Sequence, residues 1–223
     1  MNISNDILRH NLKNVYFLIG TACGGKTTMA KKLAKKYGWI HFNDNYHEDN
    51  FSNWEKIQAE RKKDDEPKAP DWEHYFNRSP EEFTDSLNEM ILQYAEYALI
   101  EIIKLAYNNI VVADIHLPVA LIKELAPHNQ VACLLAPPEL VVRDYYDRDD
   151  HREIYECIMS LKNPEKSLEN MNNTFRLGTQ RTIDEVKASG LFYLIREDDS
   201  TVKKTFAKLE KHFGLAKSVS ECE

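Results

Sequence analysis

Short apolar runs alternate with segments of helical periodicity along the chain. Five runs stand out: Val15–Ile19, Trp39–Phe42, Ile110–Ala113, Val131–Leu135 and Leu191–Ile195. A short run of consecutive apolar residues is typical of a strand that is buried on both faces of a parallel sheet. The alternation of such strands with helical segments predicts an α/β protein, in which helices cover both faces of the sheet.

Helices are expected from apolar stripes and from capping signals. Met29, Leu33 and Tyr37 form one stripe of a helix that follows the first strand. Ser79 and Pro80 are a capping residue and a first-turn proline, so a longer helix is expected to begin there. Its expected core stripe is Phe83, Leu87, Ile91, Tyr94, Ala98 and Ile102. Further helices are expected at residues 138–154 and 201–212.

The segment after the first strand, residues 20–28, is called the phosphate loop here. Gly20, Gly25, Lys26 and Thr27 satisfy the pattern G-x-x-x-x-G-K-[ST] between a strand and a helix, which is the context that the motif requires. Backbone N–H groups and the helix N-terminus would then surround a β-phosphate. Lys26 would reach the β- and γ-phosphates, and the Thr27 hydroxyl would hold Mg²⁺. The alternative is a glycine turn that only starts a helix. The expected nucleotide-binding residues are Gly20, Thr21, Ala22, Cys23, Gly24, Gly25, Lys26, Thr27 and Thr28.

Acidic residues follow the second and third expected strands. Ligands of open α/β sheets lie beyond the carboxyl ends of the strands, so Asp44 is expected to orient or deprotonate an attacking hydroxyl. The alternative for Asp44 is a cap of the next turn or helix. Asp114 is expected to hold the water shell of Mg²⁺. A strand-end turn is its alternative, and His116 offers a competing polar group nearby.

Arginine is the expected third component, because charge that develops on a transferring phosphoryl group requires a permanent planar cation. Arg148 and Arg152 are spaced i, i+4 on the expected helix Pro138–Ile154, and both are expected to bind phosphate. Arg148 is expected to be the catalytic one. Surface ion pairing is the alternative, because Asp144 precedes Arg148 by four residues. Further candidates are Arg143, Arg176 and Arg181.

The charge distribution narrows the choice of partner. A net charge of −7 argues against a non-specific nucleic-acid binder, which requires a basic face. Residues 43–82 contain twelve Asp and Glu against six Lys and Arg, interleaved with aromatic residues. This mixture favours a neutral or cationic polar molecule over a phosphorylated one. A solvated acidic face with aromatic side chains packed inward is the alternative.

Cysteine usage and the terminal segments indicate the compartment. The four cysteines, Cys23, Cys133, Cys157 and Cys222, form no C-x-x-C pair, and we expect free thiols in a reducing cytosol. The first residues are polar and no apolar span reaches 18 residues. We therefore expect a cytoplasmic protein that neither enters nor binds a membrane.

With the phosphate loop, Asp44, Asp114 and the turn Ala136-Pro137-Pro138-Glu139 in view, the chain resembles the P-loop small-molecule kinases. That superfamily includes shikimate, gluconate and adenylate kinases and the chloramphenicol phosphotransferases. Closer still, the chain looks like an uncharacterised kinase-like family of bacterial proteins, with a Cys-containing phosphate loop and a Leu-Pro pair, here Leu117-Pro118, after the third strand.

The resemblance implies one domain over residues 1–223 with the three-layer P-loop NTPase fold. Its five-stranded parallel sheet would have the order 2-3-1-4-5, with ATP on the phosphate loop. Residues 43–82 would form a helical insertion that binds the acceptor, and residues 138–185 a helical lid. One departure is Cys23, which stands where these kinases usually have glycine, so the loop dihedrals are expected to differ there.

The leading hypothesis is an ATP- and Mg²⁺-dependent kinase that phosphorylates a hydroxyl of a small molecule, with Lys26, Asp44 and Arg148 as catalytic residues. One alternative is a nucleoside or nucleotide kinase. Another is a regulatory protein that binds a nucleotide without transferring its phosphate; the chain has no Asn-Lys-x-Asp guanine signature, which weakens a GTP version. Monomer and homodimer remain equally open.

Overall fold

The computed structural model describes residues 5–43, 53, 56, 71–148, 151–197 and 201–215. Within this part of the chain the strands form one parallel sheet in the order β2-β3-β1-β4-β5, which confirms the expected order. Every strand begins within two residues of the expected position. The bounds are Val15–Gly20 for β1, Ile40–Asn43 for β2, Val111–Asp114 for β3, Val131–Leu135 for β4 and Tyr193–Ile195 for β5.

The register of the sheet places the carboxyl ends of its central strands side by side. Leu18 of β1 pairs with Asp114 of β3, and Gly20 pairs with Leu134 of β4. Parallel pairing requires a crossover between successive strands, so all these strands end at the same edge. The phosphate loop, which follows Gly20, therefore starts between the ends of β3 and β4.

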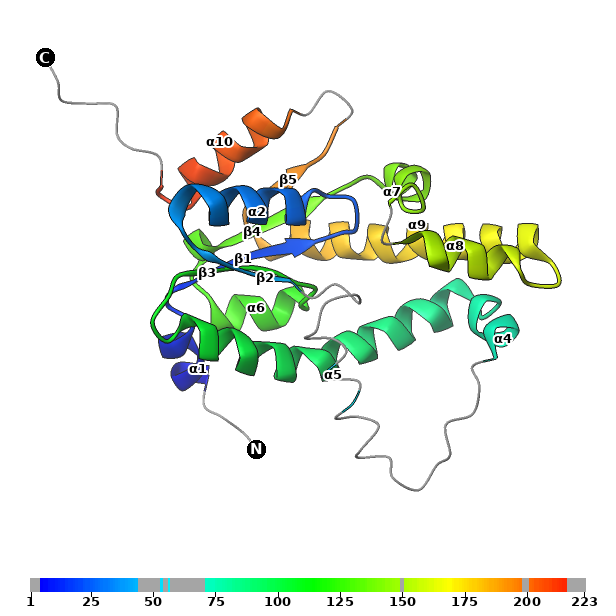
Figure 1. The fold of residues 1–223 in the computed structure, drawn as a ribbon, viewed down its shortest axis with the longest axis horizontal. Coiled ribbons are helices and arrows are strands. Elements are labelled where there is room, and N and C mark those ends of the chain that lie inside the picture. The colour runs from blue at the N-terminus through cyan, green and yellow to red at the C-terminus, as the bar shows by residue number, and fades with distance from the viewer. Residues whose placement is uncertain are drawn as a thin grey trace, which may run out of the picture.

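Helices cover both faces of the sheet and complete three layers (Figure 1). Helices α2 and α10 pack on one face, and α1, α5, α6 and α9 pack on the other. Their bounds are Asn5–Asn11 (α1), Lys26–Tyr37 (α2), Trp72–Phe76 (α4), Pro80–Ala106 (α5), Val119–Leu125 (α6), Pro138–Asp144 (α7), Arg152–Met159 (α8), Pro164–Ser189 (α9) and Val202–His212 (α10), with a 3-10 turn at His128–Gln130.

Neighbouring residues of β1 supply the two cores. Phe17 and Ile19 join the core on the α5 face, whereas Leu18 joins the core on the α2 face, and all three are buried. This follows from the period of two along a strand. Each such fully buried side chain stabilises the fold by about 1.5–3 kcal/mol relative to its exposed state.

Helix α5 begins at the expected capping signal. The Ser79 hydroxyl oxygen accepts a hydrogen bond from the Glu82 N–H at 3.2 Å, and Pro80 occupies the first turn. Of the expected stripe, Leu87 and Ile91 are only half-buried, and the other four residues are buried. The first turns of α5 belong to a separate cluster with α4, α8 and α9, built on Phe76, Phe83, Ile158 and Met171.

The expected continuous helix over residues 138–154 is wrong. Helix α7 ends at Asp144 and α8 begins at Arg152, so Arg148 lies between two helices. Tyr145 and Tyr146, which follow α7, both contact Phe175 of α9, with ring centroids 4.2 and 5.9 Å away.

The two longest helices are amphipathic. Helix α5 has 27 residues and α9 has 26, and both carry charged side chains along their length. In α9 the buried face even includes Ser167, Thr174 and Thr179. Among the residues that the structure describes, no helix combines the length and the apolar character that crossing a bilayer requires.

Candidate functional site

The phosphate loop lies directly on the end of β4. A Cβ atom added at Gly20 or Gly24 would stand 2.3 Å from the Leu134 carbonyl oxygen, a distance at which no side chain fits. The Thr21 N–H donates to the same oxygen at 3.2 Å, and the Thr21 hydroxyl accepts from the Ala136 N–H at 2.7 Å. Close backbone packing therefore requires glycine at positions 20 and 24, whereas Gly25 has open space around its Cβ position and is distinguished by its positive φ of 91°.

Lys26 is the first residue of α2, and only 7% of it is exposed. Its Nζ donates to the Thr21 carbonyl oxygen at 2.8 Å and lies 3.4 Å from the Gly20 carbonyl oxygen. The Nε2 atom of His116 is 3.5 Å away. Because Gly25 precedes the helix, no side chain caps its first N–H groups. The ammonium and the helix N-terminus therefore concentrate positive charge at the loop.

Asp114 ends β3 with 2% of the residue exposed. Burial by itself raises the pKa of its carboxyl, but the neighbouring His41 and Thr27 side chains and the charges of Lys26 and His116 outweigh burial and hold the pKa below the ordinary value. The His41 Nε2 atom lies 3.8 Å from Asp114 Oδ2. Asp114 is thus an ionised carboxylate beside the phosphate loop.

The residues at this edge fit a magnesium ion that is held mainly by a nucleotide. Asp114 Oδ2 is buried, has no hydrogen-bond partner and lies 3.8 Å from His41 Nε2, so this oxygen can still accept a closer ligand beside Thr27. In the described part of the chain, no three His, Cys, Asp or Glu side chains gather as metal ligands. Mg²⁺ in nucleotide sites uses one or two protein oxygens together with phosphate and water. Thr27 and Asp114 match that arrangement.

A pocket of about 410 Å³ opens above the loop. One side is formed by the loop and the first turn of α2, and the other by the segment after α7 and the end of β5. The lining residues are Cys23, Gly24, Gly25, Lys26, Thr27, Thr28, Asp144, Asp147, Arg148 and Arg196. The structure thus places the expected Arg148 opposite the phosphate loop.

Arg196 belongs to this pocket, and the sequence analysis missed it. Its Nη1 donates to the Cys23 carbonyl oxygen at 2.9 Å, and its Nη2 lies 3.2 Å from Asp144 Oδ2. A signal was present, because Arg196 directly follows β5 at the carboxyl edge where ligands of such sheets lie. The arginines expected from the sequence all lie between β4 and β5.

Cys23 is held in an unusual environment. Its φ of 56° lies in the left-handed region, which L-residues rarely adopt. Burial raises the pKa of its thiol, with a further increase from Asp144, and the neighbouring cations only partly offset this. Burial also raises the pKa of Cys133 to about 12. The described cysteines, Cys23, Cys133 and Cys157, are free thiols as expected, and Cys222 lies outside the described residues.

The other arginines near the expected lid lie away from the pocket lining. Arg152 does not share a helix with Arg148; its Nε is 3.4 Å from Glu156 and 77% of its side chain is exposed. Arg143 donates to Asp144 at 2.7 Å. Surface ion pairing, the alternative weighed above, describes the contacts of these two residues.

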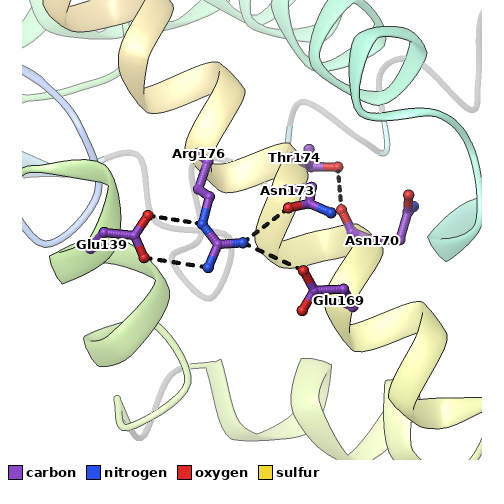
Figure 2. Close-up of polar contacts among 6 residues, drawn as sticks. All are labelled: Glu139, Glu169, Asn170, Asn173, Thr174 and Arg176. Atoms are coloured by element: carbon purple, nitrogen blue, oxygen red, sulfur yellow. Dashed lines mark hydrogen bonds and ion pairs between the residues drawn. The ribbon is translucent and has the colours of Figure 1, made fainter.

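Arg176 links two helices of the same region (Figure 2). Its Nε and Nη2 atoms donate to the two carboxylate oxygens of Glu139 at 2.9 and 3.3 Å, which joins α9 to α7. The third nitrogen, Nη1, donates to Asn173 Oδ1 at 3.0 Å and lies 3.7 Å from Glu169. Arg181 likewise joins α9 to α5 through Asp85 at 2.8 Å. Both arginines are therefore engaged between helices.

The expected acceptor region is described only in part. Asp44 and most of residues 43–70 lie outside the described residues. In the part that is described, the Tyr75 ring contacts Phe76 and Phe83 with centroids 5.0 Å apart, and the Arg78 guanidinium lies 4.7 Å from the Tyr75 ring. The aromatic side chains here pack on one another, but Trp72 and Tyr75 remain 44% and 36% exposed, so they are not packed inward as the alternative expected.

Comparison with protein-family models and with curated protein sequences finds no match for this chain. Among solved structures, the chain is similar to shikimate kinase from Acinetobacter baumannii in complex with shikimate, with 17% identity and a TM-score of 0.44. The alignment covers 95% of this chain and 99% of that chain. The fold assignment accordingly rests on the strand order and on the phosphate loop seated between β1 and α2.

Proposed function

We propose that this protein is an ATP- and Mg²⁺-dependent kinase that transfers the γ-phosphoryl group to a hydroxyl of a small molecule. The observation that carries the proposal is the convergence of three features at one sheet edge. These are a loop whose Gly20 and Gly24 pack directly on the Leu134 carbonyl group, the buried Lys26 ammonium, and the ionised Asp114, whose Oδ2 has no hydrogen-bond partner. The loop backbone and Lys26 suit a polyphosphate, and Asp114 suits its magnesium ion.

The residues divide the work between binding and charge stabilisation. The phosphate loop and Lys26 bind the β- and γ-phosphates, and Thr27 and Asp114 hold the metal. Arg148, which lines the same pocket, neutralises charge that develops on the transferring group. When bound, Mg²⁺ would neutralise charge on the β- and γ-phosphate oxygens. Arg152 has no part in this assignment.

Phosphoryl transfer forms one phosphorus–oxygen bond and breaks another. The acceptor oxygen forms a bond to the γ-phosphorus, the bond from that phosphorus to the β,γ-bridging oxygen breaks, and ADP leaves with the electron pair. The hydroxyl proton passes to Asp44, the expected base, or to water. The acidic balance of residues 43–82 favours a neutral or cationic acceptor over a phosphorylated one.

The test is ADP release with ATP, Mg²⁺ and a panel of acceptors, measured above the acceptor-free background. The panel should contain neutral polyols, amino alcohols, nucleosides and nucleoside monophosphates. Lys26→Ala should lower turnover at least 100-fold, because it removes the buried cation from the phosphate site. Lys32→Ala, which removes an exposed lysine of the same helix, is the matched control and should keep turnover within about twofold.

The outcomes separate the hypotheses. Turnover of Lys26→Ala at a tenth or more of wild type would contradict this mechanism. Preference for nucleosides or nucleoside monophosphates would select the nucleotide-kinase alternative. Tight nucleotide binding without transfer to any acceptor of the panel would identify a regulatory protein instead.

A further inference from the structure

We propose that Arg196 is a positioning residue of the phosphate loop. It holds the backbone of Cys23 in its left-handed conformation and thereby sets the direction of the neighbouring N–H donor, that of Gly24. The nucleotide part of this inference rests on the proposed function, because it concerns the same site. The stabilisation of the Cys23 backbone by Arg196 rests on the observed contacts alone and does not depend on the proposed function.

The left-handed backbone conformation of Cys23 requires stabilisation by residues outside the loop. Among the residues that the structure describes, it is the one non-glycine residue with a positive φ, at 56°. An L-residue in this region brings Cβ close to the following carbonyl oxygen, and such strained residues persist only where the surroundings over-determine them. Cysteine also lacks the side-chain amide or carboxylate with which Asn and Asp stabilise this conformation locally.

Arg196 stabilises this conformation, and its own backbone is fixed by a hydrogen bond to β4. Its own N–H donates to the Leu135 carbonyl oxygen at 2.8 Å, which fixes its backbone at the end of β4. Its guanidinium then reaches the Cys23 carbonyl oxygen at 2.9 Å, while Asp144 holds another of its nitrogens at 3.2 Å. A hydrogen bond from a charged donor is about twice as strong as a neutral one.

The hydrogen bond from Arg196 to the Cys23 carbonyl oxygen also sets the orientation of the peptide bond between Cys23 and Gly24 at the pocket. The bond between Cys23 and Gly24 is trans, since the described chain has no cis peptide. In a trans peptide the carbonyl and the N–H point in opposite directions. With the carbonyl directed at Arg196, the Gly24 N–H is directed away from it. Gly24 lines the pocket, so its N–H direction is part of the shape offered to a phosphate.

A direct contact between Arg196 and a bound phosphate is the rival explanation, and Cys23→Gly separates the two. Glycine adopts the left-handed region without strain, so the loop of that variant needs less support from Arg196. Loss of the guanidinium charge would weaken phosphate binding equally with cysteine or glycine at position 23. Loss of positioning would weaken it only with cysteine.

The first experiment measures the dissociation constant of Mg·ADP by calorimetry for wild type, Arg196→Gln, Cys23→Gly and the double variant. Arg196→Gln should raise the constant about tenfold or more in the cysteine background, as expected for a lost charged hydrogen bond, and less than about threefold in the glycine background. Arg196→Lys should give partial rescue. Equal losses in both backgrounds would overturn the proposal.

Arg143→Gln is the matched control, because Arg143 also pairs with Asp144 but does not line the pocket. It should leave the Mg·ADP constant within about twofold. A loss as large as that of Arg196→Gln would assign the effect to Asp144 rather than to Cys23, and would overturn the proposal.

The second experiment needs no nucleotide. Urea unfolding of the same four proteins should show that Arg196→Gln lowers the midpoint of the cysteine protein at least twice as much as that of the glycine protein. Additive effects of the two substitutions on the urea midpoint would contradict the proposal that Arg196 stabilises the conformation of Cys23. A wild-type protein that binds no Mg·ADP would instead overturn the proposed function and the nucleotide part of this inference, while the unfolding cycle still decides the rest.

Discussion

Gly24 and Gly178 show how differently two glycines of one chain are used. A Cβ at Gly24 would lie 2.3 Å from the Leu134 carbonyl oxygen and 2.7 Å from its carbon, and backbone atoms of a central strand have no room to move. A Cβ at Gly178, inside α9, would meet the Thr84 methyl group at 3.6 Å and the Thr84 hydroxyl oxygen at 3.8 Å, which are ordinary contacts. The first glycine is required by packing, whereas the second is not.

Opposite effects are therefore expected from the same substitution. Gly24→Ala should lift the loop from β4, lower the unfolding free energy by about 1–3 kcal/mol and weaken Mg·ADP binding at least 100-fold. Gly178→Ala should raise the unfolding free energy by about 0.5–1 kcal/mol, because alanine is favoured in a helix interior. Urea unfolding and calorimetry measure both. Mg·ADP affinity of Gly24→Ala within threefold of wild type would contradict the close-packing argument.

At the scale of the elements, the break between α7 and α8 decides which arginine faces the pocket. Tyr145 and Tyr146 pack on Phe175 of α9, and the chain leaves the helix there. Arg148 consequently lies in the connection and lines the pocket, whereas Arg152 starts the next helix and pairs with Glu156. A continuous helix would have given the two residues similar surroundings.

This difference predicts the kinetics of two otherwise identical substitutions. Arg148→Gln should lower the rate of phosphoryl transfer about 100-fold or more, because it removes charge stabilisation of the transition state. Its effect on Mg·ADP affinity should stay below about tenfold, since the effect belongs mainly to the reaction step. Arg152→Gln, the control, should change neither quantity by more than twofold. Single-turnover kinetics that found equal losses for both variants would refute the assignment.

At the scale of the whole molecule, the site is assembled from segments that are distant along the chain. The phosphate loop, the end of β3, the connection after α7 and the end of β5 meet at one edge of the sheet. The strands that position them have cores on both faces. A ligand that bridges these segments binds the folded chain and not the unfolded one, so binding must stabilise the fold.

Mg·ADP at 100 times its dissociation constant should therefore raise the unfolding free energy by about 2.7 kcal/mol. For a chain of this size that corresponds to an increase of roughly 5–10 °C in Tm. Removal of Mg²⁺ with EDTA should abolish at least half of the increase, because Thr27 and Asp114 act through the metal. Lys26→Ala should show no increase. Differential scanning calorimetry provides the measurement, and an EDTA-insensitive shift would argue against a metal at Asp114.

Local signals in the sequence were enough for the sheet and for the phosphate loop. Apolar runs mark β1 to β5 to within two residues, the capping signal at Ser79 marks the start of α5, and the glycine pattern with Lys26 marks the loop. These features are encoded by neighbours along the chain, through burial, capping and backbone freedom. The strand order was correctly expected from the resemblance to P-loop kinases and is confirmed by the strand pairing.

The partners of the arginines were decided only by the tertiary structure. The sequence of residues 138–154 has a helical period, yet the helix ends at Asp144, where Tyr145 and Tyr146 pack on Phe175 of α9. Arg176 and Arg181 join helices because Glu139 and Asp85 reach them across the fold. Arg196 reaches Cys23 from 173 residues away. Local patterns carry no information about such contacts, because they arise only when the packing of whole elements brings distant side chains within a few ångströms.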